Sequence, residues 1–245
     1  MTTSILDWIY PPTCMACRAI LPLNNNFLRD LWICHQCINL FEPITGPICK
    51  TCGAPVETEI EKCASCYGKN LHFTSNRACF IYDEVIRDLM HNLKFRNKRY
   101  IAEGLGKIWA NHVACYMSTI TDAVLVPLPM HPDKQVERGF NQAEILSNAL
   151  SKVSSIPTDN ILERTEDTPP QSGLHPALRA ENVQDAFVIR PNFHPERKNY
   201  ILIDDIYTTG SSLNECAKTL KNSGINNVLC MTLCISVKNT PERLI

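Results

Sequence analysis

Four Cys-x-x-Cys pairs near the N-terminus constrain the fold of this chain more than any other feature. They take eight of its 13 cysteines: Cys14, Cys17, Cys34, Cys37, Cys49, Cys52, Cys63 and Cys66. Two thiolates separated by two residues can face one point at a tight turn, so two pairs supply the four soft ligands of a tetrahedral zinc site. Four pairs therefore predict two zinc ions. With four protein thiolates on each ion no position remains open for catalysis, which predicts a structural role.

The order of pairing follows from loop length. We expect the first two pairs to form one site and the last two the other, because short loops close at the lowest entropic cost. The sequence leaves an interleaved arrangement open. Residues 1–75 contain few large apolar side chains, and such a segment buries too little surface to fold without metal. We therefore predict a zinc ribbon module over residues 1–75 and a second domain over residues 76–245.

Charge and hydropathy exclude some classes of protein. The formal net charge is −1, which indicates no particular partner. The N-terminus lacks the basic start and apolar run of a signal peptide, and no stretch approaches the ~18 apolar residues of a membrane span. We expect a cytoplasmic protein without a membrane span. In that compartment paired cysteines are more often metal ligands than disulfides.

Strand and helix patterns alternate after residue 76. Strands are expected over residues 78–82, 123–129, about 200–205 and within 228–237, and helices over residues 85–95, 101–117, 141–153 and about 211–223. This alternation predicts an α/β fold with a mainly parallel sheet and helices on both faces. In such sheets ligands bind beyond the carboxyl ends of the strands.

The segment YILIDDIYTTGSSL, residues 200–213, lies at one such strand end. Its loop offers successive backbone N–H groups, small hydroxyls and one glycine before a helix, which is typical of a phosphate cradle. The lysine of a Walker motif is absent. Asp204 and Asp205 can accept hydrogen bonds from adjacent hydroxyls, as a sugar 5-phosphate would offer. An ordinary turn and helix cap is the alternative, but two neighbouring buried carboxylates are costly without a ligand or cation.

This segment resembles the phosphoribosyl pyrophosphate signature of type I phosphoribosyltransferases. With VPLPMHPDKQVERGFNQAEIL at residues 126–146, RTEDTPPQSGLHPALRAENVQDAF at residues 164–187 and the cysteine pairs, nearly the whole chain resembles the ComF family of competence-associated proteins. The resemblance implies a type I phosphoribosyltransferase-like domain behind a double zinc ribbon. It also implies phosphoribosyl pyrophosphate with magnesium as the ligand, and a role in natural transformation.

The resemblance also implies roles for individual residues. The acidic pair would hold the ribose hydroxyls and the following loop would wrap the 5-phosphate. The expected ligand-binding residues are Asp204, Asp205, Tyr207, Thr208, Thr209, Gly210, Ser211 and Ser212. Lys134 and Arg138 would face the pyrophosphate, and residues 171–179 would form a mobile flap that carries Arg179. A solvated charge at Lys134 and an ordinary surface loop at residues 171–179 remain alternatives.

Two functions fit this pattern. The first is a magnesium-dependent phosphoribosyltransferase, whose acceptor the sequence does not name. Purine-salvage enzymes usually have an Asp where this chain has Thr208, so nucleobase salvage is the weaker variant. The second is an accessory protein that handles incoming single-stranded DNA, with the pocket as a binding or sensing site and the ribbon as a docking surface for other DNA-uptake proteins.

The segment LKFRNKRY, residues 93–100, is a candidate for nucleic-acid contact. It interleaves two aromatic residues with four cations: Lys94, Arg96, Lys98 and Arg99. Such a composition suits phosphate contact with base stacking. A solvated helix face is the alternative.

Overall fold

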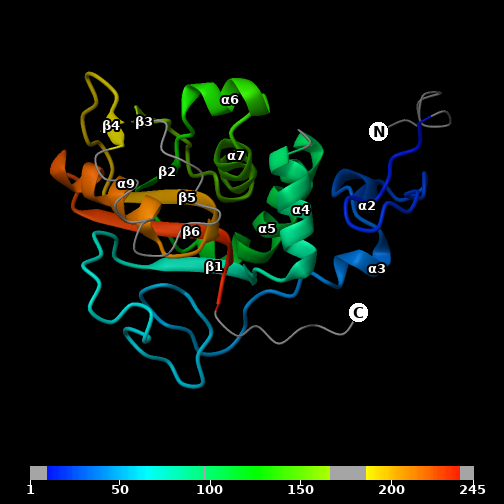
Figure 1. The fold of residues 1–245 in the computed structure, drawn as a ribbon, viewed down its shortest axis with the longest axis horizontal. Coiled ribbons are helices and arrows are strands. Elements are labelled where there is room, and N and C mark those ends of the chain that lie inside the picture. The colour runs from blue at the N-terminus through cyan, green and yellow to red at the C-terminus, as the bar shows by residue number, and fades with distance from the viewer. Residues whose placement is uncertain (1–9, 96–97, 166–185, 238–245) are drawn as a thin grey trace.

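A parallel four-stranded sheet forms the centre of the molecule (Figure 1). The computed structural model describes residues 10–95, 98–165 and 186–237. The sheet order is β1 (Asn76–Ile81), β6 (Asn227–Ile235), β5 (Asn199–Tyr207) and β2 (Ala123–Pro127), and every neighbouring pair is parallel. The strands are nearly continuous apolar runs because helices cover both faces of the sheet.

Side chains of β5 alternate between two hydrophobic clusters. Ile201 and Ile203 join the cluster of α4 (Glu84–Phe95), α5 (Arg99–Met117) and α7 (Gln142–Ser154). Tyr200 and Leu202 join the opposite cluster, with the buried face of α9 (Ser211–Asn222). Successive side chains of a strand point to opposite faces, so these sets lie on the two sides of the sheet. The predicted α/β fold with helices on both faces is confirmed.

The segment after β2 contains a helix where the sequence analysis predicted neither a helix nor a strand. Residues Pro132–Arg138 form a short helix, α6. Pro132 occupies the first turn, where its missing N–H costs nothing, and the ring of His131 accepts a hydrogen bond from the N–H of Asp133. Gly139 ends α6 in the left-handed conformation, at φ 77°. None of the seven residues is buried, so α6 has no apolar stripe that the sequence could reveal.

A second, two-stranded sheet lies beside α9. In it β3 (Leu162–Arg164) pairs antiparallel with β4 (Phe187–Ile189). The flap expected at residues 171–179 falls between these strands in sequence, and with Arg179 it lies outside the described residues.

The two cysteine ribbons pack against opposite sides of the sheet. The first contains the short helices α2 (Asn26–Asp30) and α3 (His35–Ile38) and lies beside α4 and α5 (Figure 1). The second lies along β1, where the N–H of Asn76 donates to the carbonyl of Thr51 over 2.8 Å. This contact covers part of an otherwise open sheet edge. Packing therefore continues across the proposed boundary near residue 75.

Candidate metal and phosphate sites

Each ribbon gathers four cysteines. Cys14, Cys17, Cys34 and Cys37 form one cluster, and Cys49, Cys52, Cys63 and Cys66 form the other; within each, all sulfur atoms lie within 4.8 Å of one another. The sequential pairing predicted from loop length is confirmed.

The surroundings of these sulfurs suit a bound soft cation. The N–H of Cys34 donates to the Sγ of Cys14 over 3.4 Å, and the N–H of Cys63 donates to the Sγ of Cys49 over 3.3 Å. Burial opposes ionisation of Cys49, but backbone N–H groups outweigh it and lower its pKa to about 7. Burial instead raises the pKa of Cys66, to about 12, so the thiols of one cluster differ. The four-sulfur donor set is the chemistry that zinc requires, and on that ground both clusters are consistent with structural zinc.

The side chains of the acidic pair, near the end of β5, lie on opposite faces of the sheet. Asp205 lies on the same face of β5 as Ile201 and Ile203, the face covered by α4 and α7, and its side chain is buried. Asp204 lies on the same face as Leu202, the face covered by α9, and its side chain is partly exposed. An Asp204 carboxylate oxygen also accepts a 2.8 Å hydrogen bond from the N–H of Asp205. Because adjacent residues face opposite sides, the two carboxylates meet different neighbours.

Asp205 is surrounded by polar groups from three helices. The Nζ of Lys94 on α4 lies 3.1 Å from its Oδ2, and the Nε2 of Gln142 on α7 donates to the same oxygen over 3.3 Å. The Oε1 of Gln142 in turn accepts a 2.8 Å hydrogen bond from Arg138, at the end of α6. The RGFNQ motif thus connects Arg138 to the acidic pair through the glutamine at its other end.

These neighbours set the pKa values of the pair in opposite directions. Burial favours the neutral form of both carboxyls, but the charge and hydrogen bond of Lys94 outweigh burial and lower the pKa of Asp205. Burial and the nearby charge of Asp205 raise the pKa of Asp204 well above its ordinary value. Burial opposes charge on Lys94 as well, yet Asp205 raises the pKa of that amine. The pair therefore consists of one carboxyl group that ionises readily, Asp205, and one that resists ionisation, Asp204.

Lys94 makes a contact that the sequence did not predict. The sequence grouped it with the nucleic-acid candidates, whereas its side chain reaches the acidic pair and is 29% exposed. Arg99 instead pairs with Glu103 over 3.0 Å on the solvent side of α5, and Lys98 caps that helix; Arg96 lies outside the described residues. Lys94 follows the buried Met90 by four positions, and this spacing could have placed it on the inner face of α4.

The loop after β5 turns tightly into α9. Gly210 caps the helix at φ 77°, and a Cβ there would lie 2.5 Å from the hydroxyl of Tyr207. The hydroxyl groups of Thr209 and Ser211 lie 2.9 Å apart. The loop thus consists of small side chains and a glycine in a tight turn at the N-terminus of α9, and the phosphate cradle there stays a prediction.

Tyr207 lies beneath this loop. It is 4% exposed, its ring packs edge-on against Phe73, and burial raises its pKa. Its hydroxyl has no hydrogen-bond partner among the described residues. Of the eight predicted ligand-binding residues, Tyr207 thus supports the loop from below and its side chain does not face solvent.

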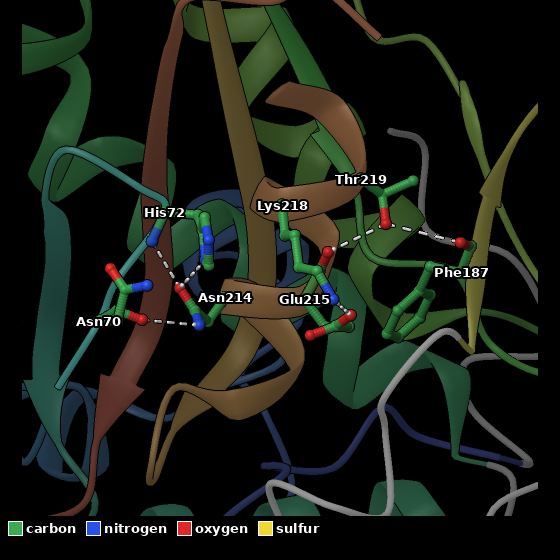
Figure 2. A network of polar contacts seen from close by, with 7 residues as sticks. All are labelled: Asn70, His72, Phe187, Asn214, Glu215, Lys218 and Thr219. Atoms are coloured by element: carbon green, nitrogen blue, oxygen red, sulfur yellow. Dashed lines mark hydrogen bonds and ion pairs between the residues drawn. The ribbon is translucent and has the colours of Figure 1, made fainter. Parts of the chain in front are cut away.

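The loop and α9 also contact the end of the second ribbon. The Nζ of Lys69 donates to the carbonyl of Thr209 over 3.1 Å. Figure 2 shows the adjoining network, in which Asn214 on α9 accepts a 2.6 Å hydrogen bond from the N–H of His72 and donates to the carbonyl of Asn70 over 3.2 Å. Sequence analysis missed these residues, because nothing in the local pattern relates them to a loop 140 positions away.

A cleft of about 420 Å³ opens on the other side of α7, next to α6. Its lining includes His131, Gln135, Glu144 and Arg164, but neither acidic residue of β5. Lys134 lies on α6 and does not line this cleft. Of the two predicted pyrophosphate cations, Arg138 is connected to the acidic pair through Gln142, and the role of Lys134 stays a prediction.

The sheet, the loop and the ribbons define an α/β protein with a glycine-capped loop after β5 and an N-terminal double cysteine ribbon. The double zinc ribbon domain family matches residues 5–67. The chain is 30% identical over 222 residues to competence protein F of Haemophilus influenzae, covering 88% of this chain and 93% of the relative. It therefore belongs to the ComF/ComFC family of competence proteins.

Other relatives extend this picture. Identity is 29% to competence protein ComFC of Bacillus subtilis, over 80% of each chain. It is 28% to the DNA utilization protein YhgH of Escherichia coli, over 91% of this chain and 97% of the relative. Adenine phosphoribosyltransferase of Saccharomyces cerevisiae aligns over 57% of this chain and 72% of its own, at 16% identity and a TM-score of 0.34. This last similarity is too low to assign a ligand.

None of the helices in the described part of the chain combines the length and the apolar character needed to cross a bilayer.

Proposed function

We propose that this protein binds phosphoribosyl pyrophosphate with magnesium at the carboxyl end of β5 and acts in the handling of incoming single-stranded DNA. One observation carries the ligand assignment. Asp204 and Asp205 lie in the last four residues of β5, which ends at Tyr207, and the loop that follows is capped by Gly210 at the N-terminus of α9. Hydroxyl-accepting carboxylates and a phosphate cradle at adjacent positions match the ribose and the 5-phosphate of one ligand.

In this proposal each residue has a role that its environment supports. The two carboxylates accept hydrogen bonds from the ribose hydroxyls, and Thr208 to Ser212 donate backbone and hydroxyl groups to the 5-phosphate. Lys94 keeps Asp205 ionised, since its amine lies 3.1 Å from that carboxylate. Arg138 provides positive charge for the pyrophosphate, oriented by Gln142. Magnesium, when bound, neutralises charge on the pyrophosphate oxygens.

Calorimetry with phosphoribosyl pyrophosphate and magnesium tests the ligand assignment. Changing Asp204 and Asp205 together to Ala should reduce affinity at least 100-fold, an effect of about 3 kcal/mol, because the ribose hydroxyls lose both acceptors. The control is Asp88→Asn on the exposed side of α4, where the side chain is 78% exposed. Binding by the double variant as tight as by the parent would refute the assignment.

A catalytic and a sensing role are separated by pyrophosphate release. The protein is incubated with phosphoribosyl pyrophosphate, magnesium and a pool of nucleobases. Base-dependent release would support a phosphoribosyltransferase, including nucleobase salvage as the alternative function. Binding without release would support a sensing pocket.

The DNA-handling role rests on the family. Relatives are named competence proteins and a DNA utilization protein, and we extend that role to this chain. We also propose that both cysteine clusters hold zinc and that the ribbons offer a surface to other DNA-uptake proteins. Metal analysis of protein purified without chelator should give about two zinc ions per chain, one for each four-cysteine cluster.

A further inference from the structure

We infer that Lys69, delivered by the second cysteine ribbon, is the cation of the phosphate cradle. The inference rests on the proposed function and names a further binding residue for the same site. The loop Thr208–Ser212 contains no basic residue, although a phosphate carries charge that backbone N–H groups alone leave partly uncompensated. A lysine from another part of the chain would complete the cradle.

The position of Lys69 fits this role. Its Nζ lies 3.1 Å from the carbonyl oxygen of Thr209, in the middle of the loop. Lys69 is exposed, so its amine remains hydrated and has two further protons to donate. A phosphate resting on the N–H groups of the same loop would lie within reach of those protons.

The backbone of Lys69 is fixed by the metal cluster. Its N–H donates to the carbonyl of Cys66 over 3.2 Å, and Cys66 is one of the four cysteines of the second cluster. The amine is therefore attached to a turn that the proposed zinc ion would hold rigid. A pre-positioned cation loses less conformational entropy on binding than one on a mobile loop.

A second set of contacts locks the ribbon to the other end of the loop. The Oδ1 of Asn214 accepts a hydrogen bond from the N–H of His72 (Figure 2). The N–H of Asn214 donates to the carbonyl of Gly210. Beneath the loop, the buried hydroxyl of Tyr207 lacks a hydrogen-bond partner within the described residues. Ribbon and loop therefore behave as one unit around the anion position.

The alternative is a surface lysine whose hydrogen bond to Thr209 merely stabilises the loop. The two readings differ in their dependence on ligand charge. Loss of a lysine that only stabilises the loop would change the affinity for all ligands alike. Loss of a lysine that binds phosphate would lower the affinity only for ligands that carry a 5-phosphate. Pyrophosphate, which we place on the opposite side near Arg138, then serves as an internal reference.

The test is calorimetric titration of the full chain with ribose 5-phosphate and, separately, with magnesium pyrophosphate. We compare the parent with Lys69→Met, Lys69→Arg and the control Lys62→Met, an exposed lysine of the same ribbon. Lys69→Met should lower the affinity for ribose 5-phosphate about 10- to 100-fold, as expected for loss of a charged hydrogen bond. Lys69→Arg should recover most of that loss, and pyrophosphate affinity should change less than threefold.

Equal affinity of the parent and Lys69→Met for ribose 5-phosphate would overturn the inference, as would equal weakening of both ligands. Zinc content and unfolding midpoint, measured on every variant, identify a protein whose ribbon has lost its fold. In that case Lys69→Gln provides the same test with a shorter, polar side chain. Failure of the parent itself to bind ribose 5-phosphate or phosphoribosyl pyrophosphate would instead refute the proposed function.

Discussion

At the scale of single residues, Asp204 and Asp205 are adjacent in sequence, yet their pKa values are shifted in opposite directions. Asp205 has Lys94 at 3.1 Å, whereas burial and the charge of Asp205 disfavour ionisation of Asp204. Because the pKa of Asp204 is raised on folding, its contribution to stability is present at acidic pH and is lost as pH rises through that raised pKa. The Asp204 carboxylate therefore costs stability at neutral pH, and in our proposal the same carboxylate accepts hydrogen bonds from the ribose hydroxyls.

The variant Asp204→Asn tests this balance. It should be more stable than the parent by about 1 kcal/mol at pH 8, with a smaller difference at pH 5, because the amide removes a disfavoured charge. Phosphoribosyl pyrophosphate affinity should fall. Urea unfolding at both pH values, with calorimetry, measures the two effects.

Asp205→Asn provides the matched control with the opposite sign. The pKa of Asp205 is lowered on folding, so its contribution is present above its ordinary pKa and is lost as pH falls. Removing this carboxylate leaves Lys94 without its ionic partner and should destabilise the protein by about 1 to 3 kcal/mol at neutral pH. An Asp204→Asn variant less stable than the parent at pH 8 would contradict our assignment of the strained charge.

At the scale of elements, the two ribbons support different parts of the molecule. The first packs against α5, where a Cβ on Gly104 would lie 2.6 Å from the carbonyl of Leu31. The second is fixed to β1, since the Nδ2 of the buried Asn76 donates to the carbonyl of Cys52 over 2.9 Å. The second ribbon also contacts the loop before α9, through the hydrogen bond from Lys69 to the carbonyl of Thr209.

Replacing one cysteine in each ribbon should therefore give different results. Cys34→Ser and Cys63→Ser should each release one zinc, because a three-thiolate site loses much of its metal-binding energy. We expect Cys63→Ser to lower the affinity for ribose 5-phosphate about tenfold or more, and Cys34→Ser to change that affinity little. Metal analysis and calorimetry on both variants measure this, and equal weakening by the two would contradict a ribbon-specific role.

At the scale of the whole molecule, each ribbon extends one of the two hydrophobic clusters. The first cysteine cluster joins the core shared by α4, α5 and α7, and the second joins the core shared by α9. The cations of residues 93–100 also differ in position: one contacts a buried carboxylate and another lies on the surface. Lys94 reaches the acidic pair, whereas the Arg99 side chain is 63% exposed on α5.

This division predicts separable effects on DNA and ligand. Changing Arg96, Lys98 and Arg99 together to Ala should weaken binding of single-stranded DNA, and binding by the parent should fall steeply between ~50 and 200 mM salt as counterions are released. Lys94→Ala should instead weaken phosphoribosyl pyrophosphate. Fluorescence anisotropy with DNA of mixed sequence measures the first effect.

The matched control for DNA binding changes two exposed lysines elsewhere, Lys152 on α7 and Lys221 on α9, to Ala. DNA binding that is equally affected in the control would indicate non-specific attraction, and binding unaffected by the triple change would move the DNA site elsewhere.

The sequence by itself determined the features that depend on neighbouring residues. Cysteine spacing predicted both clusters and their pairing, because a Cys-x-x-Cys turn is a local structure. Alternating strand and helix periods predicted the parallel sheet, and the end of β5 identified the acidic pair with its loop. The short helix α6 escaped prediction because it buries no side chain and so has no apolar period.

Only the tertiary structure decided which distant groups meet at the site. Lys94 reaches Asp205 from α4, and Gln142 reaches it from α7, because both helices cover the same face of the sheet. Lys69 reaches Thr209 because the second ribbon folds back over the opposite side. Local spacing can place a side chain on the inner face of its own helix, as for Lys94, but it does not say which distant residue that side chain will contact. They arise when apolar surfaces far apart in sequence are buried against one sheet, and the polar groups at its edge are brought together as a result.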